Sequence, residues 1–158
     1  MILSFLKDDI MNKVVGIVAA AVVAAGGYFG AQALGLFGAK ALSAEEISTV
    51  LESRAKEIND SGDLNYDSWS SLTSAVHMEK QLTVRGKSLL TADQLSGGPE
   101  GYMESRKGQA ANFLCHDETM KAALAGGAKF VYQWSDANGE TLGMFTATGA
   151  NYCADAGY

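Results

Sequence analysis

Apolar residues recur along residues 43–60 at the spacing of an amphipathic helix. Ser43 and Glu46 fit a capping box at its start. The apolar stripe that follows consists of Ile47, Val50, Leu51, Ala55 and Ile58. We therefore predict a helix of about 15 residues, which the turn-forming run NDSGDLNYDS would end.

A period of two replaces the helical period between Leu72 and Leu90. Four apolar residues, Val76, Met78, Leu82 and Val84, share one parity, and Lys80 interrupts them once. This alternation predicts a strand with one wet face. It places His77 on the polar side, where a solvated or edge histidine is commoner than a metal ligand.

Helical periodicity returns after Gly97-Gly98-Pro99. Pro99 favours a helix start here, because proline suits the first turn of a helix. We predict a helix from Pro99 to about Leu114, with a stripe of Met103, Ala110, Phe113 and Leu114. A second, short helix follows in ETMKAALAGG. Acidic residues at its start and the glycine pair at its end match the polarity of a helix.

The C-terminal part alternates again. Phe130, Tyr132 and Trp134 fall on one face of a strand, and Asn138-Gly139 supplies a hairpin turn before a returning strand. Such aromatics usually bury, so a core role is favoured, while a ligand or partner face at Phe130, Tyr132 and Trp134 stays open. The elements together predict an α+β domain over residues 40–158. We expect a small antiparallel sheet covered by helices on one side, with the aromatic hairpin at its centre.

Residues 14–39 are set apart by their composition, because they carry no charge and a single amide. A helix over this stretch could span a hydrocarbon core of about 30 Å. We expect an uncleaved anchor, with residues 1–13 in the cytoplasm and the domain in the periplasm, hence a single-pass inner-membrane protein. The alternative is a signal peptide cleaved near Ala33 or Ala41, which would leave a secreted or periplasmic domain.

The net charge of the domain narrows the range of partners that we expect. Residues 1–39 are electrically balanced, so the net charge of −6 belongs to residues 40–158. A negative domain without a Lys/Arg cluster repels phosphate backbones, so we expect no nucleic-acid partner. The expected partners are the membrane, through residues 14–39, and another envelope or membrane protein.

The run NFLCHDETM places Cys115 beside His116 and two carboxylates, as a nucleophile beside its base would be. Consecutive residues seldom face each other, however, and His77 would have to serve as the base instead. Zinc ligation by Cys115, His116, Cys153 and His77 matches no known spacing. In an exported domain, a disulfide between the two cysteines, 38 positions apart, is the favoured interpretation. It would stabilise by about 4 kcal/mol on the chain-entropy model.

Other chemistry is not indicated. Asp63, Asn65 and Asp67 alternate like the start of a calcium loop, but the required glycine and glutamate do not follow. Hydrolase, phosphate-loop and dinucleotide motifs are missing. We therefore expect no catalytic residues, no metal and no cofactor.

The segment CHDETMKAALAGGAKFVYQWSDANGETLGMFTATGANYC, from Cys115 to Cys153, resembles a group of small exported bacterial envelope proteins of unknown function. These have a cysteine, a short helix, an aromatic hairpin and a final cysteine in that order. The resemblance implies an envelope location and a disulfide between the cysteines, and no activity. The expected function is a membrane-anchored, non-catalytic envelope protein that binds another protein or serves as an accessory subunit. An exported thiol-dependent enzyme or oxidoreductase using Cys115, or a small-ligand-binding domain, is the alternative.

Overall fold

A computed structural model describes residues 40–158. The predicted membrane span over residues 14–39 lies outside this part of the chain. The helices are α2 (Ala44–Asp60), η2 (Ala92–Gln94, a 3-10 turn), α3 (Gly98–His116), α4 (Glu118–Ala125) and α5 (Tyr152–Asp155). The strands are β1 (Leu64–Asp67), β2 (Ser70–Met78), β3 (Gln81–Ser88), β4 (Lys129–Ser135) and β5 (Thr141–Thr148). None of the helices described is long and apolar enough to cross a membrane.

The five strands form one mixed sheet in the order β1-β2-β3-β4-β5. The pair β3–β4 is parallel, and the other neighbours are antiparallel. A parallel pair needs a long crossover connection, which α3 and α4 provide. The prediction of an α+β fold is confirmed, but the expectation of a purely antiparallel sheet with the aromatic hairpin at its centre was wrong. The β4–β5 hairpin lies at one side of the sheet.

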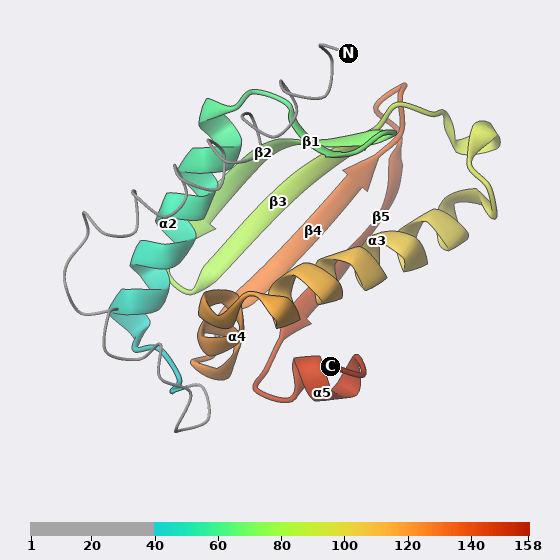
Figure 1. The fold of residues 1–158 in the computed structure, drawn as a ribbon. Coiled ribbons are helices and arrows are strands. Elements are labelled where there is room, and N and C mark those ends of the chain that lie inside the picture. Colours follow the sequence, from blue (N-terminus) through green and yellow to red (C-terminus); the bar gives the residue numbers. More distant parts are fainter. Residues whose placement is uncertain (1–39) are drawn as a thin grey trace, which may run out of the picture. The chain divides into compact units, whose positions relative to one another are not determined.

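Both long helices cover the same face of the sheet (Figure 1). The helix α2 packs on β2 and β3, and α3 packs on β5. The opposite face carries no helix among residues 40–158, and Val76 and Met78 are exposed on it. The helix-covered face therefore forms the core.

The first helix is as predicted. Its capping box at Ser43 and Glu46 is formed, because each side chain accepts a hydrogen bond from the other residue's backbone N–H. The buried stripe is Ile47, Leu51, Ala55 and Ile58. The run predicted to be a turn contains the short edge strand β1.

The single strand predicted from Leu72 to Leu90 is a hairpin. A two-residue turn at Glu79 and Lys80 separates β2 from β3, and Ala75 lies opposite Val84. Opposite residues share a face, so this turn reverses the parity: even-numbered residues face the core in β3, but not in the part of β2 that follows its bulge between Leu72 and Ser74. Leu82 and Val84 are buried as expected. Val76 and Met78 are exposed, at 50% and 69%.

The same reversal corrects the prediction for His77. Its Nε2 lies 3.2 Å from the Ser48 hydroxyl of α2 and 2.8 Å from the Glu79 carbonyl oxygen. His77 therefore faces the helix layer from the end of β2, and it does not stand on the wet face.

The β4–β5 hairpin is confirmed, and Gly139 of its turn has a positive φ of 86°. The turn is organised by Asp136, which is only 1% exposed. Its carboxylate accepts hydrogen bonds from the backbone N–H groups of Ala92, Asn138 and Glu140. Burial alone would raise the pKa of Asp136, but these hydrogen bonds outweigh burial and hold it below its ordinary value.

The two cysteines form the predicted disulfide. Cys115 at the end of α3 and Cys153 in α5 have Cα atoms 5.5 Å apart and are both 6% exposed. The bridge therefore joins α3 to the C-terminal turn and encloses α4, β4 and β5 in one covalent loop.

Candidate functional site

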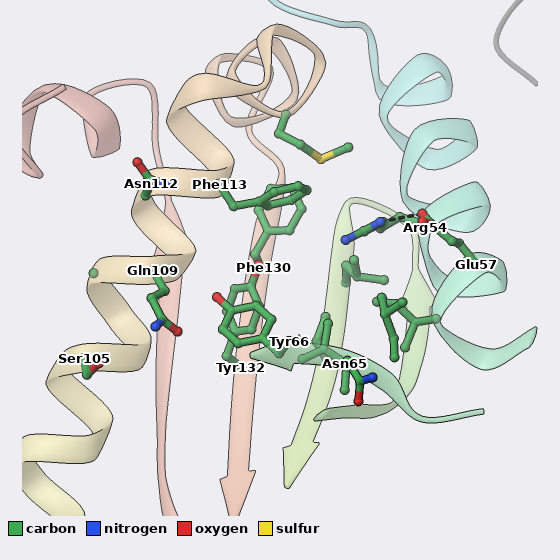
Figure 2. Close-up of a pocket in the computed structure, with 17 residues that line it drawn as sticks. Arg54, Glu57, Asn65, Tyr66, Ser105, Gln109, Asn112, Phe113, Phe130 and Tyr132 are labelled. Atoms are coloured by element: carbon green, nitrogen blue, oxygen red, sulfur yellow. Dashed lines mark hydrogen bonds and ion pairs between the residues drawn. The ribbon is translucent and has the colours of Figure 1, made fainter. Parts of the chain in front are cut away.

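A groove with a volume of about 650 Å³ lies between α2 and α3 (Figure 2). Strands β1 to β4 form its floor. The floor is largely apolar and is built by Leu64, Tyr66, Leu72, Leu82, Val84, Phe130 and Tyr132. The groove thus lies over the centre of the sheet, where the two helices stand apart.

The walls of the groove are largely polar. The helix α2 contributes Arg54, Glu57 and the apolar Ile58, and α3 contributes Ser105, Gly108, Gln109, Asn112 and the aromatic Phe113. The α3 residues follow the spacing of one helical face. Apart from its chain neighbours and the adjacent helix backbone, no atom lies within 4 Å of the position that a Cβ atom would take on Gly108. The α3 wall is therefore lowest at Gly108.

Arg54 extends across the groove from α2. It forms an ion pair with Glu57 on its own helix, and its guanidinium carbon lies 5.0 Å from the centre of the Phe113 ring on α3. Figure 2 shows the guanidinium pointing toward the aromatic side chains between the helices. A cation over an aromatic face is attractive. Arg54 and Phe113 therefore form the one contact of this kind between the two walls in the described domain.

The aromatic floor is uncharged at physiological pH. Burial raises the pKa of Tyr66 to about 12, although the nearby Arg106 opposes this. Burial also raises the pKa of Tyr132, which is 6% exposed and stacks on Phe145. Both phenols stay protonated, so the floor suits an apolar occupant.

A buried cation supports the groove from below α3. Arg106 forms an ion pair with Asp67 and donates hydrogen bonds to Ser70 and Gln109, each at 2.9 Å. Its guanidinium carbon is 4.5 Å from the Tyr102 ring centre and 5.3 Å from that of Trp134. Arg106 thereby fixes α3 to the β1–β2 corner, which sets the width of the groove at that end.

The predicted aromatic face divides between two environments. Phe130 and Tyr132 line the floor of the groove, whereas Trp134 lies against Tyr66, Tyr102 and the backbone of Gly86. All three are buried in the core, with exposed fractions of 1%, 6% and 2%. Only Phe130 and Tyr132 could contact an occupant of the groove.

The residues of NFLCHDETM are not assembled as a nucleophile and base. Both sulfurs are in the disulfide, so Cys115 presents no thiol. The Nδ1 atom of His116 lies 2.8 Å from the Asn112 carbonyl oxygen, and Asp117 caps α4 by accepting from the Thr119 and Met120 N–H groups. Within residues 40–158, no group of three His, Cys, Asp or Glu residues could hold a metal ion.

The polar groove-lining residues of α2 and α3 were not predicted from the sequence. Ile58 and Phe113 were expected only as members of apolar stripes, and neither Gly108 nor Arg54 was singled out. One signal was present: the polar residues Ser105, Gln109 and Asn112 recur at helical spacing in a helix that must cover a sheet. That pattern marks a helix face held away from the core.

No family model and no curated protein matches this chain. Solved structures do share its fold. A candidate secreted protein from Pseudomonas aeruginosa superposes with a TM-score of 0.53 at 19% identity, over 72% of this chain and 97% of that one.

Two pilotins of type II secretion systems are also similar. AspS from Vibrio cholerae gives a TM-score of 0.54 at 14% identity, and EpsS from Vibrio vulnificus gives 0.54 at 13%. Each match covers 70% of this chain and 94% of the pilotin. At such identities the likeness establishes a common fold.

Proposed function

We propose that this chain is an exported, non-catalytic accessory protein whose domain holds an apolar segment of a protein partner in the groove between α2 and α3. The groove carries this proposal. It combines an uncharged aromatic and aliphatic floor with walls that are largely polar, the arrangement expected for a segment that is apolar on one side.

Export is supported by the buried disulfide, since such bridges persist in oxidising compartments. The shared fold of a candidate secreted protein and two secretion-system pilotins agrees with an accessory role in the envelope. We further propose that residues 14–39 anchor the chain in the inner membrane and that residues 40–158 face the periplasm.

Site-specific photo-crosslinking in the native host tests the groove. A photo-crosslinking residue at Ser105, on the α3 wall, should give a discrete protein adduct. The same residue at Arg85, which is exposed on the opposite face of the sheet, serves as the control and should give none. Equal labelling from both positions would contradict a groove-specific partner.

Gly108 offers a matched pair of variants for the same experiment. Gly108→Phe adds a ring where open space lies above the groove wall, and Gly108→Ala adds a single methyl group. The Ser105 adduct should be lost in Gly108→Phe and retained in Gly108→Ala. Loss in both variants, or in neither, would remove the support for this groove as the binding site.

A small amphipathic ligand is the second candidate, because a volume of about 650 Å³ also falls within the range of small-molecule sites. Native mass spectrometry of the exported protein separates the two. A bound small molecule that Gly108→Phe displaces would favour a ligand site over a protein partner.

A further inference from the structure

We infer that the outer edge of β5 is a docking surface for a second copy of this chain, so that two sheets join through paired β5 strands into one of ten strands. This surface is separate from the groove, to which β5 contributes no residue. The inference therefore stands whether or not the groove binds a partner.

The first observation is that this edge is unpaired within residues 40–158. β5 hydrogen-bonds to β4 on one side, and it is the last strand of the sheet that these residues form. No backbone group of β5 has another backbone partner among residues 40–158. Figure 1 shows β5 as the outermost strand at that side. An open row of N–H and C=O groups is a template for another strand.

The second observation is that the two edges of the sheet differ. β1 has four residues, is interrupted by a bulge between Asn65 and Asp67, and ends in a charged residue. These are the usual protections of an edge strand. β5 has eight residues, TLGMFTAT, with neither a charge nor a proline. Its one bulge, at Leu142, lies near its start and leaves residues 143–148 in regular register with β4. The protein protects one edge and leaves the other able to pair.

This asymmetry favours a closed dimer. A two-fold arrangement uses the same surface on both copies, so the open edge of one copy pairs with the open edge of the other and neither remains unpaired. Pairing cannot continue at β1, because that edge is short and bulged. One open edge per copy therefore gives a pair of molecules, whereas two open edges would give a fibre.

The uncharged sequence of β5 permits pairing with a second copy. Residues 40–158 carry a net charge of −6, so two copies repel each other over most of their surfaces. The β5 edge is uncharged, and identical strands can meet there without a like-charge pair. A different protein would need distinguishing features at this edge, and the eight residues offer no charge to recognise.

The geometry of such a pair places Met144 at its centre. Opposite residues of antiparallel strands share a face, so each β5 residue faces one of equal parity in the second copy. The two-fold axis then runs through the Met144 pair or the Phe145 pair, because these two residues stand at the middle of the strand. Met144 is 63% exposed and would face Met144 or Thr146 of the second copy.

The strand is also held rigidly enough to act as a template. Phe145 stacks on Tyr132 with 5.0 Å between ring centres, and Met103 of α3 packs directly over Gly143. These contacts hold β5 through its helix-covered face and do not involve its outer edge. Pairing would therefore order no new segment.

The test uses the full chain in detergent micelles, with Met144→Lys as the variant and Met78→Lys as its control. Met78 has the same side chain, faces the same open side of the sheet and is 69% exposed, but it lies on the inner strand β2. Lysines at Met144 would lie close together across the two-fold axis and repel. Sedimentation should show a dimer for the wild type and for Met78→Lys, and a monomer for Met144→Lys.

Amide hydrogen exchange gives a second readout. In the wild-type dimer, alternate backbone amides of β5 should exchange more slowly than in the Met144→Lys protein. The amides of β2 should exchange at the same rate in both proteins. A wild-type chain that stays monomeric as its concentration rises would overturn the inference. So would a dimer that Met144→Lys leaves intact, because that dimer would be held elsewhere in the chain.

Discussion

At the scale of single residues, Arg106 stands out because its guanidinium-bearing side chain is only 7% exposed. Such a group persists only where its charge is paired and hydrogen-bonded. Asp67, Ser70 and Gln109 supply the partners, and Tyr102 and Trp134 supply aromatic faces. The cluster fixes α3 against the β1–β2 corner.

Replacing this cation should cost stability. Arg106→Met keeps much of the apolar stem but leaves the Asp67 carboxylate, which is 26% exposed, without its cation. We expect the free energy of unfolding to fall by about 2 to 3 kcal/mol, less than for a fully buried pair. Denaturant titration measures the loss. Arg85→Met, at an exposed position of β3, should change stability by less than about 0.5 kcal/mol.

The same pair sets a pH dependence. Burial alone would raise the pKa of Asp67, but hydrogen bonds from Ser70, the Trp69 N–H and Arg106 outweigh burial and lower it. A carboxyl with a lowered folded-state pKa stabilises the fold above its unfolded-state pKa. That contribution is lost as pH falls through the folded-state value. The stability gap between wild type and Asp67→Asn should therefore be full at pH 7 and shrink below about pH 4.

At the scale of elements, the close packing of β3 and β4 depends on a glycine, Gly86 of β3, which has no side chain. A Cβ atom on Gly86 would lie 2.4 Å from the Trp134 ring, which is 2% exposed. Glycine at this position lets the indole lie directly on the strand. The fit between β3 and β4 thus depends on a residue without a side chain.

Two glycine substitutions should act in opposite directions. Gly86→Ala must displace the Trp134 ring, so we expect a loss of about 1 to 3 kcal/mol. Gly108→Ala lies in a helix with open space around its Cβ position, so we expect a gain of about 0.5 to 1 kcal/mol. Thermal unfolding of both variants checks the signs. Equal effects would show that backbone entropy alone governs both sites.

The elements also show what the sequence could reveal. The turn at Asn138-Gly139 has a recognisable signal, and so does the capping box at Ser43. The turn at Glu79-Lys80 has no such sequence signal. Glu79 adopts a positive φ of 52°, although glycine and asparagine are the residues that usually indicate this conformation. One hidden turn therefore merged two strands and inverted the predicted faces of Val76, Met78 and His77.

The groove could not be predicted from any one segment. Its lining comes from three helices, α2, α3 and α4, and from strands β1 to β4, which the crossover between β3 and β4 brings together. The choice of a parallel pair there is a tertiary outcome, because each strand alone has the same alternating pattern. Four floor residues, Leu82, Val84, Phe130 and Tyr132, were recognised on predicted strands, whereas Leu64 and Tyr66 fell in a predicted turn. The space above the floor depends on how far apart α2 and α3 stand.

At the scale of the whole molecule, the disulfide should provide a large share of the stability of a domain this small. Replacing Cys115 and Cys153 by serine frees a loop 38 positions long, which costs about 4 kcal/mol on the chain-entropy model. Unfolding of the double variant and of the reduced wild type should agree. A loss below about 1 kcal/mol would show that native contacts alone hold the ends of this loop together.

The covalent loop has a second consequence, for a chain whose backbone is cut. Cleavage at any single bond between Cys115 and Cys153, for instance in the exposed turn at Asn138-Gly139, would leave both pieces joined through sulfur. The nicked molecule would keep its mass apart from one added water, and β4 and β5 would still be held to the same sheet. A protease in the surroundings could thus damage this part of the protein without releasing a fragment from it.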